Sequence, residues 1–370
     1  MKLVHDPLHG YIELDDFAVR LVDTPEFQRL RRITQLGFAF LAYPSARHTR
    51  FEHSLGTFHL AKRVRGYNPE VEEGVVYAAL LHDLGHYPFS HTLEGIFPKH
   101  EENTAWIIKH GSIGDVIRER YSIPEFLNLL KHPVVSGDID VDRMDYLVRD
   151  AYYTGAAYGV VDLERLLRNL KFDGRRLIIE EKGLIAAQNL LLARAMMHPT
   201  VYFHHTAKIA EAMLRKAVEL EGILLEEIRT MDEIDLISKL RNSEKPEVRE
   251  LIKAIDSRNL YKRAYCSKVE LEGKILDEMK GVLEDEFGHL AILNYPPKPK
   301  YEERNAFVMT GGELRRLSDV SPLVKSLVEM KDVHWEWCVY AEKEIKEEVG
   351  AFLKSFLDPY RSNYSGKERG

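Results

Sequence analysis

The sequence predicts a mainly α-helical protein with a smaller α+β region toward its C-terminal end. Apolar residues recur at helical spacing along the first two thirds of the chain, beginning near Asp15. After about residue 256 the pattern changes to short apolar runs bounded by proline and glycine, which is typical of strands and turns. The chain has 370 residues, of which 45% are apolar and 30% charged, so it can bury a large core.

The first 170 residues are expected to be helical after a short extended start. Residues 1–14 look irregular or weakly extended, with a turn at His9-Gly10. Thr24-Pro25-Glu26 favours a helix start, because a capping residue precedes proline in the first turn. A helix that should stop near Gly85 carries a His-Asp pair. The helices are expected at 52–64, 71–84, 101–110, 113–120, 124–130, 140–150 and 162–170.

The remaining elements are a hairpin, one or two long helices and several strands. The hairpin is expected at 171–181, turning at Asp173-Gly174. Residues 183–230 are rich in Leu, Ala and Met and indicate the long helices. Strands are expected at 265–271, 306–310 and 334–340, with a short helix between the last two and a proline-rich loop at 294–300.

Composition restricts the partners and the compartment. The net charge of -7 argues against a general nucleic-acid-binding surface. Cys266 and Cys338 are the only cysteines, so we expect neither a disulfide scaffold nor a thiolate metal cluster, which favours a reducing compartment. The N-terminal residues lack a signal-peptide apolar run, and no stretch approaches the length of a membrane span. We therefore predict a cytoplasmic protein that binds neither membranes nor nucleic acid.

The pair His82-Asp83, inside an apolar run, is the first indication of chemistry. Half of the sixteen histidines lie between His48 and His110. His53, His82, Asp83 and Asp142 together mix nitrogen and hard oxygen donors, which suits Mn, Fe, Mg, Co or Zn without distinguishing them. Ligands so far apart in sequence must come from different helices, leaving coordination positions for water and substrate. Any single histidine is more often structural or exposed, but the group favours a metal site.

Five sequence blocks in the first 215 residues support this interpretation. They are Asp6-Pro-Leu-His-Gly-Tyr-Ile-Glu-Leu, Asp23-Thr-Pro-Glu-Phe-Gln-Arg-Leu-Arg with Gln35-Leu-Gly, Arg50-Phe-Glu-His-Ser-Leu-Gly, His82-Asp-Leu-Gly-His-Tyr-Pro-Phe-Ser-His, and Asp140-Val-Asp-Arg-Met-Asp-Tyr-Leu-Val-Arg-Asp. In order and content they resemble the HD superfamily of metal-dependent phosphohydrolases. More narrowly they resemble the deoxynucleoside triphosphate triphosphohydrolases (dGTPase-like), which include animal enzymes that add a sterile-alpha-motif domain, here expected to be absent.

The resemblance implies an HD helical bundle over residues 1–215, with its motif region at about 48–150. Residues 216–370, helical and then α+β, would form a regulatory or oligomerisation part. By likeness the metal ligands are His53, His82, Asp83 and Asp142. The catalytic histidine and acid positions are His86, His91, His100 and Glu101. His91 would protonate the leaving 5′-oxygen while metal-activated water attacks the α-phosphorus, and Glu94 would orient His91.

The resemblance also assigns nucleotide-binding residues. Arg50, Arg143 and Arg194 would clamp phosphates, because guanidinium groups match phosphate oxygens. Gln35 and Leu36 would line the deoxyribose, and Tyr146 and Asp150 would hold the sugar, with the Tyr146 ring blocking a ribose 2′-hydroxyl. Arg194, His198 and Tyr202 recur at spacing four, which predicts one face of a single helix directed at the nucleotide. A packing face is the alternative for this stripe.

A regulatory nucleotide site is a further implication of the resemblance. Asp23, Gln28 and Arg31 match positions that bind an activating guanine nucleotide in the animal enzymes, and a neighbouring subunit would contribute Arg258 and Lys262. The predicted assembly is therefore a homo-oligomer, a dimer or tetramer, activated by GTP or dGTP. The chain departs from the family at His5 and matches it poorly after about residue 265; a solvated charged face is the alternative.

The predicted function is the hydrolysis of a deoxynucleoside triphosphate to the deoxynucleoside and inorganic triphosphate. Two alternatives share the same residues. One is another HD phosphohydrolase, such as a 5′-nucleotidase or a cyclic-nucleotide or guanosine-tetraphosphate phosphodiesterase. The other is a nucleotide-binding regulator with an idle metal site. Retention of His91, His100 and Glu101 favours an enzyme, since an idle site has no need of proton donors.

Overall fold

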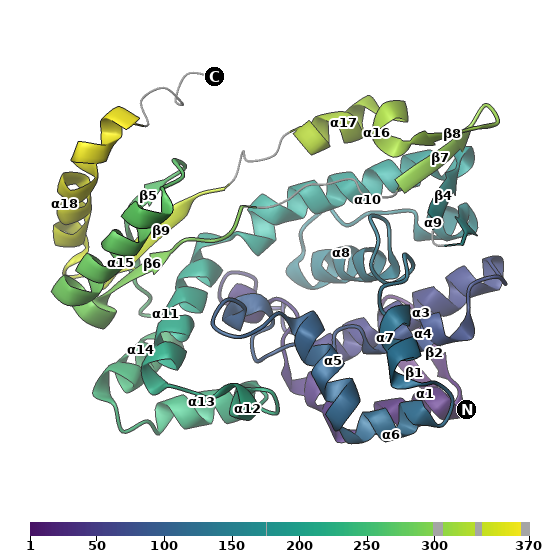
Figure 1. The fold of residues 1–370 in the computed structure, drawn as a ribbon, viewed down its shortest axis with the longest axis horizontal. Helices are drawn as coiled ribbons and strands as arrows, with labels where there is room; N and C mark the ends of the chain where they lie inside the picture. Colours follow the sequence, from purple (N-terminus) through teal and green to yellow (C-terminus); the bar gives the residue numbers. More distant parts are fainter. Residues whose placement is uncertain (175, 299–305, 330–334, 364–370) are drawn as a thin grey trace. The chain divides into compact units, whose positions relative to one another are not determined.

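The computed structural model describes residues 1–174, 176–298, 306–329 and 335–363 (Figure 1). The described chain is mainly helical with small sheets, as the sequence predicts. It divides into two compact units. The first unit comprises residues 1–204, 224–236 and the described part of 301–331; the second comprises 205–223, 237–300 and the described part of 332–370. Whether function divides at residue 215 stays a prediction.

The first unit begins with an antiparallel hairpin of β1 (Lys2–Asp6) and β2 (Gly10–Leu14). The sequence predicts weakly extended backbone here, and the observed pairing is more regular than that. Gly10 has φ 68°, a left-handed conformation that favours glycine at this turn. Short helices follow: α1 (Asp16–Val22), capped by the Asp15 carboxylate, and α2 (Pro25–Gln28).

Four helices carry the predicted site residues: α3 (Arg50–Tyr67), α4 (Glu73–Leu81), α5 (His100–His110) and α8 (Val141–Thr154). Helix α3 packs between α4 and α8, and α4 is buried along nearly its whole length. The expected helix over 71–84 is too long, because α4 ends at Leu81. A Cβ on Gly85 would lie 2.3 Å from the His100 carbonyl oxygen, so α5 approaches the chain too closely for a longer regular helix.

The rest of the first unit surrounds this core. It contains α6 (Ser112–Arg118), α7 (Ile123–Leu129), α9 (Leu163–Arg168) and the predicted hairpin, observed as β3 (Leu170–Asp173) and β4 (Arg176–Glu180). The short helix α12 (Leu225–Ile228) also belongs to it. Strand β7 (Ala306–Thr310) pairs in parallel with β4, and β8 (Glu313–Arg316) completes the order β3-β4-β7-β8. Residues 306–310 therefore form a strand, as expected, but join the sheet of the first unit.

Helix α10 (Leu184–Met197) lies beside α17 (Pro322–Glu329), which follows α16 (Leu317–Val320) (Figure 1). The sequence predicts that Arg194, His198 and Tyr202 share one regular helix. Instead, α10 ends at Met197 and a π-helical turn covers His198–Tyr202. Pro199 has no backbone N–H to continue the α-helical ladder, which explains the change of winding.

The second unit combines helices with a small antiparallel sheet. Its helices are α11 (His205–Glu221), most of α13 (Glu233–Arg241), α14 (Pro246–Asp256), α15 (Gly273–Phe287) and α18 (Lys346–Leu357). Its sheet has the order β5-β9-β6, formed by β5 (Lys262–Ser267), β9 (Trp337–Ala341) and β6 (Ala291–Asn294). Helices α15 and α18 contact this sheet, and apolar residues of both helices share one core with it. The expected strands 265–271 and 334–340 are thus shifted, and parts of 294–300 and 334–340 lie outside the described residues.

Cys266 and Cys338 form a disulfide between the neighbouring strands β5 and β9. The sequence predicts no disulfide scaffold. This bond shows that the two cysteines nevertheless pair, although a single disulfide bond is not a scaffold. The two residues are 72 positions apart in sequence and become neighbours only when the strands pair. The bond removes the argument for a reducing compartment, so a cytoplasmic location stays a prediction. Within the described residues, no helix is both long and apolar enough to span a bilayer.

Candidate metal and nucleotide site

The four predicted metal ligands converge in the first unit. His53 lies on α3, Asp142 on α8, and His82 and Asp83 in the turn after α4. His53 Nε2 lies 3.0 Å from Asp142 Oδ1 and 3.4 Å from Asp83 Oδ2. His82 Nε2 lies 3.2 Å from Asp83 Oδ1 and 3.6 Å from Asp142 Oδ1. His53, His82 and Asp142 each offer a donor atom close enough to the others to hold one divalent ion. Asp83 lies beside this group.

The two imidazole rings are held so that their Nε2 atoms face the carboxylates. His53 Nδ1 lies 2.8 Å from Asp145 Oδ2, and His82 Nδ1 lies 2.8 Å from the Ala79 carbonyl oxygen. Both Nε2 atoms are buried without a hydrogen bond of normal geometry. Metal-binding histidines commonly donate their other N–H to a carboxylate or a carbonyl in this way. These residues therefore fit a metal ion, which would satisfy the buried Nε2 lone pairs.

The electrostatics of the group also favour a cation. Burial lowers the pKa of His53, but the nearby carboxylates of Asp142, Asp145 and Asp83 outweigh it and raise the pKa to about 10. Burial raises the pKa of Asp83, yet the Arg50 guanidinium and His82 hold it well below its usual range. The carboxylates thus stay ionised and attract positive charge. A divalent ion would compete with the proton on His53, so its affinity should depend on pH.

Asp145 supports this group and was not among the predicted site residues. It lies on α8, three residues after the predicted ligand on that helix, and it is fully buried. Besides His53, its oxygens contact His9 Nε2 at 2.6 Å and accept hydrogen bonds from Arg149 at 2.8 and 2.9 Å. A Cβ on Gly56 would lie 1.9 Å from Asp145 Oδ1, so only glycine permits this approach. Its place in the Asp140–Asp150 motif was the available sequence signal.

The predicted phosphate clamps Arg50 and Arg143 direct donors at protein atoms. The buried Arg50 guanidinium donates to Asp83 Oδ2 at 2.5 Å and to Ser90 Oγ at 2.9 Å. Arg143 donates to the Asp140 carboxylate and to the Gly137 carbonyl oxygen. Arg50 therefore joins the metal-ligand group to the segment before His91. Contact of either arginine with a phosphate stays a prediction.

A second cluster contains His86, His91, Glu94 and His100, and its ligand atoms also lie close enough to hold a metal. Glu94 lies 3.1 Å from His91 Nδ1 and 2.6 Å from His100 Nδ1. The His86 ring is stacked on His100 with 4.0 Å between centroids. The His91 side chain is 60% exposed, so it can reach a substrate. Glu101 lies farther out, 66% exposed and 3.5 Å from His100 Nδ1.

The two clusters meet at Asp83 and His86. His86 Nε2 lies 3.2 Å from Asp83 Oδ1, and the ring centroids of His86 and His91 are 4.7 Å apart. Burial raises the pKa of Glu94, but hydrogen bonds from His100 and His91 lower it far more. Glu94 therefore stays ionised and can hold two imidazoles. The arrangement places an accessible imidazole close to a group that fits a cation.

The predicted sugar-binding residues also lie together. Asp150 is buried; its Oδ2 accepts a hydrogen bond from the Tyr202 hydroxyl at 2.8 Å, and its Oδ1 lies 2.7 Å from His48 Nε2. The Tyr202 ring is 6.2 Å from Tyr146 and 5.2 Å from His198 between centroids. Although it is a π-helical turn, this segment still places Tyr202 against α8, with His198 beside it. His48, which fixes Asp150, was not predicted; its position at the edge of the histidine-rich region was the only signal.

Other predicted substrate residues border the same region. Burial raises the pKa of Tyr146 to about 12, while the positive charge of Arg194 acts against this rise. Gln35 is buried, and its Oε1 atom has no hydrogen-bond partner. Leu36 is partly buried against the core. A buried amide oxygen without a partner is consistent with a ligand site beside Gln35.

The predicted regulatory residues of the first unit engage one another and their surroundings. Asp23 pairs with Lys2 Nζ at 3.2 Å. Gln28 accepts a hydrogen bond from Arg31 Nε at 2.8 Å, and the Arg31 guanidinium lies 3.6 Å from the Phe51 ring centroid. These contacts fit a solvated surface, and a nucleotide would have to compete with them. The regulatory role stays a prediction.

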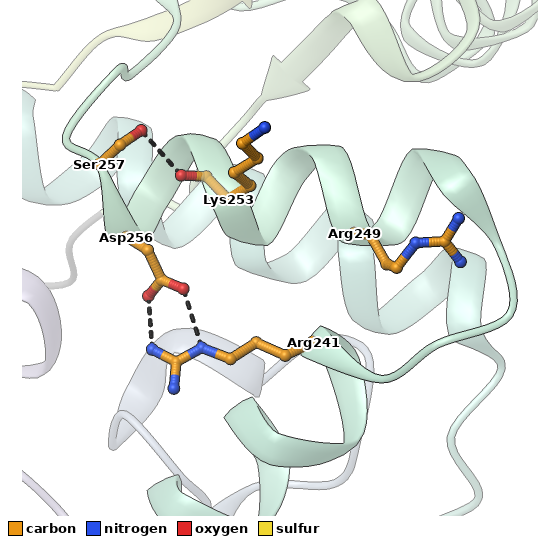
Figure 2. Close-up of a pocket in the computed structure, with 5 residues that line it drawn as sticks. All are labelled: Arg241, Arg249, Lys253, Asp256 and Ser257. Atoms are coloured by element: carbon orange, nitrogen blue, oxygen red, sulfur yellow. Dashed lines mark hydrogen bonds and ion pairs between the residues drawn. The ribbon is translucent and has the colours of Figure 1, made fainter.

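The other two predicted regulatory residues belong to the second unit, between α14 and the start of β5. Arg258 has φ 57°, and Lys262 is the first residue of β5. A nearby basic pocket of about 530 Å³ contains neither residue (Figure 2). Arg241 lines this pocket and makes a bidentate ion pair with Asp256, both bonds at 2.8 Å. The positive charge of Arg241 is therefore already neutralised. The pocket is lined by Arg241, Arg249, Lys253, Asp256 and Ser257.

Comparison with known proteins matches two family descriptions. Residues 50–150 match the HD domain, and residues 161–365 match the HD associated region. An uncharacterized protein of Methanocaldococcus jannaschii is 40% identical, covering 94% of this chain and 81% of its own length. The deoxynucleoside triphosphate triphosphohydrolase SAMHD1 homolog of Dictyostelium discoideum is 32% identical over 70% of this chain and 59% of its own length. Human SAMHD1 is 29% identical over 74% of this chain and 56% of its own length.

Two solved structures are similar over nearly the whole chain. A hypothetical protein from Aquifex aeolicus has a TM-score of 0.79 and 31% identity, covering 95% of this chain and 100% of its own. A phosphohydrolase from Bacteroides thetaiotaomicron has a TM-score of 0.75 and 25% identity, covering 93% and 100%. The chain spans less than two thirds of the length of the SAMHD1 relatives.

Proposed function

Since this chain belongs to the HD domain phosphohydrolase family, we propose that it hydrolyses a deoxynucleoside triphosphate to the deoxynucleoside and inorganic triphosphate. The observation that carries the proposal is the contact between the two clusters. Asp83 lies beside His82 in the predicted metal group and beside His86 in the histidine cluster. A phosphate centre held at the junction would have a cation site on one side and an accessible proton donor, His91, on the other.

His53, His82, Asp83 and Asp142 would hold the divalent ion, which would supply Lewis-acid polarisation of a phosphoryl oxygen and activation of water. Asp145 and the Ala79 carbonyl keep the two imidazoles in the orientation that this requires. The ion could be Mn, Fe, Mg, Co or Zn, because the donor set does not distinguish them.

His91 would complete the reaction by protonating the leaving group. Water would form a new bond to the α-phosphorus and release one proton to solvent, the bond from phosphorus to the 5′-oxygen would break, and His91 would give its proton to that oxygen. Glu94 holds His91 at Nδ1, so Nε2 is the atom available to the substrate. A general acid held in this way typically contributes 10²- to 10⁴-fold in rate.

Preference for a deoxynucleotide would come from the residues around Asp150. Asp150 and Tyr202 are fixed by their hydrogen bond, and Tyr146 stands next to them on α8. A ring fixed at the sugar would leave no space for a 2′-hydroxyl. The SAMHD1 relatives carry the name of this activity and support the proposal, while the base preference is left to experiment.

A product assay tests the proposed reaction. Each of the four deoxynucleoside triphosphates is incubated with the protein and one of several divalent metals, and the release of triphosphate, pyrophosphate and phosphate is measured. We expect triphosphate and deoxynucleoside only. Pyrophosphate or phosphate as the primary product would indicate another HD phosphohydrolase activity, and no turnover with any metal would favour a nucleotide-binding regulator.

The variant His91→Ala separates an enzyme from a binder. We expect activity to fall at least about 100-fold while the metal content, measured by elemental analysis, is unchanged. His110→Ala is the matched control, because His110 is an exposed histidine on α5 whose ring stacks on Trp106 of the same helix. Its activity should equal that of the wild type. Equal activity of both variants would reject His91 as the proton donor.

We also propose that GTP or dGTP activates the enzyme through a homo-oligomer. The proposal is supported by the likeness of Asp23, Gln28, Arg31, Arg258 and Lys262 to the regulatory positions of the family. Adding GTP should raise the turnover of another deoxynucleotide and shift the mass measured by light scattering to a dimer or tetramer. A flat response in both measurements would reject activation.

A further inference from the structure

The Glu233 carboxylate, at the start of α13, binds two segments that border the histidine cluster. Its Oε1 accepts hydrogen bonds from Thr34 N at 2.7 Å, from Thr34 Oγ1 at 2.6 Å and from Phe89 N at 3.1 Å. All three residues belong to the first unit. Glu233 is 199 positions from Thr34 and 144 from Phe89, so the contacts arise only in the folded chain. One oxygen therefore joins three parts of the sequence next to His91.

The segment that Glu233 binds has a strained backbone. Phe89 and Ser90 have φ angles of 59° and 57°, which are uncommon for residues other than glycine. Consecutive residues in this conformation persist only when surrounding contacts hold them. Ser90 Oγ donates to the Thr34 carbonyl at 2.5 Å, and the Phe89 ring stacks on Phe38 at 4.3 Å. Thr34 is thus bound to Ser90 on one side and to Glu233 on the other.

His91 directly follows this turn, and its ring lies edge-on to the rings of His86 and His100 at 4.7 and 5.2 Å between centroids. Its ring is 60% exposed, and its Nδ1 lies 3.1 Å from the Glu94 carboxylate. The position of the imidazole therefore depends on the backbone of Phe89 and Ser90. Burial raises the pKa of Glu233 to about 7. A solvent-exposed glutamate would not show this rise, so the carboxyl group is held inside the structure.

Residues next to Glu233 in sequence are linked, through Arg29, to the segment Leu84–His86. The Arg29 guanidinium donates to the carbonyl oxygens of Met231, Leu84 and His86, each at 2.9 Å. Arg32 pairs with Asp232. Residues 231–233 therefore contact, directly or through Arg29, the segments on both sides of His86. This short segment belongs to the first unit, although the chain enters the second unit before and after it.

We propose that Glu233 is a positioning residue: it holds the Phe89–Ser90 turn and thereby places His91 for proton transfer. The role of His91 in this statement rests on the proposed function, whereas the restraint on the turn does not. Displacement of a catalytic group by about 1 Å can lower a rate about 100-fold without altering substrate binding. The effect of losing Glu233 should therefore appear in kcat and not in KM.

The test compares Glu233→Ala and Glu233→Gln with Glu226→Ala. Glu226 is an exposed glutamate on α12 and serves as the matched control for loss of charge. Kinetics, metal content and amide hydrogen exchange over residues 87–94 are measured for each purified full-length variant. Glu233→Ala should lower kcat about 10- to 100-fold, leave KM within about twofold, retain the metal and speed exchange at Phe89 and Ser90. Glu233→Gln keeps a carbonyl oxygen and should recover kcat to within about threefold of the wild type.

Two results would overturn the proposal. One is a folded, metal-loaded Glu233→Ala protein with wild-type kcat and wild-type exchange over 87–94. The other is an equal loss of activity and metal in both Glu233 variants, which would indicate a general structural role. If the wild type releases no triphosphate, the proposed function fails; the exchange measurement still decides whether Glu233 restrains the turn.

Discussion

The predicted metal group and the neighbouring histidine cluster use similar residues in different ways. In the metal group, His53 is fully buried and the other ring nitrogens of both imidazoles are fixed by Asp145 and a carbonyl oxygen. In the histidine cluster, His91 is largely exposed and follows a strained turn. Burial and fixed tautomers suit the holding of a cation, whereas proton transfer needs a ring that reaches the substrate.

The clusters also differ in where their support comes from. The metal group is supported from within the motif helices, because Asp145 and Gly56 lie on α8 and α3. The turn before His91 is held by Glu233, which comes from α13. We therefore expect changes in the metal group to remove metal and activity together, and changes in the histidine cluster to affect activity alone.

The largest effect is expected from Asp142→Ala. This change removes a carboxylate oxygen that faces both His53 and His82. Metal content should fall below one tenth of the wild-type value, and activity should fall at least about 10³-fold. Elemental analysis and the product assay check this, with circular dichroism as the control for folding. A fully loaded, inactive Asp142→Ala protein would contradict the division between the two clusters.

Asp145→Asn should have the next largest effect. The amide still fits the space beside Gly56 but no longer holds the charge that fixes His53 and pairs with Arg149. Loss of such an outer carboxylate typically lowers metal affinity about 10- to 100-fold. Titration with metal, followed by activity, measures the change; excess metal should restore part of the rate. Failure of excess metal to restore any activity would show that Asp145 acts by another route.

Glu94→Gln and Glu101→Gln form a matched pair in the histidine cluster. Glu94 holds both His91 and His100, whereas Glu101 is largely exposed and lies 3.5 Å from His100. We expect Glu94→Gln to lower kcat about 10-fold with metal retained, and Glu101→Gln to change it less than about twofold. Equal effects would mean that Glu101 shares the role of Glu94.

The smallest effect is a pH dependence of stability due to Glu233. Its pKa is raised to about 7, chiefly by burial, while hydrogen bonds from Thr34 oppose the rise and Asp232 adds to it. A carboxyl whose folded pKa is raised is stabilising while protonated, and that contribution is lost as pH increases from about 4.5 to 7. Relative to Glu233→Gln, the wild type should lose roughly 2 kcal/mol of unfolding free energy between pH 5 and 8. Urea denaturation at both pH values measures it; an unchanged difference would contradict the assigned environment.

Much of the first unit could be predicted because its information is local. The helical spacing around His53 and Asp142 predicts α3 and α8, and the motif order identifies the four residues that converge. The π-helical turn after Met197 could not be predicted from local spacing. Pro199 interrupts a regular helix, but the surrounding structure decides whether a π turn replaces it. The pairing of β7 with β4 and the Cys266–Cys338 bond also depend on distant contacts.

The sequence by itself determined the chemical inventory: a set of nitrogen and oxygen donors on separate helices, with further histidines beside them. Local spacing and motif order carry that information because ligand identity is a property of single residues. Only the tertiary structure decided which groups support them. Asp145, His48 and Glu233 act through atoms that are 92, 102 and 144 positions away in sequence. Such hydrogen bonds depend on the approach of whole segments to within about 3 Å, which no local pattern specifies.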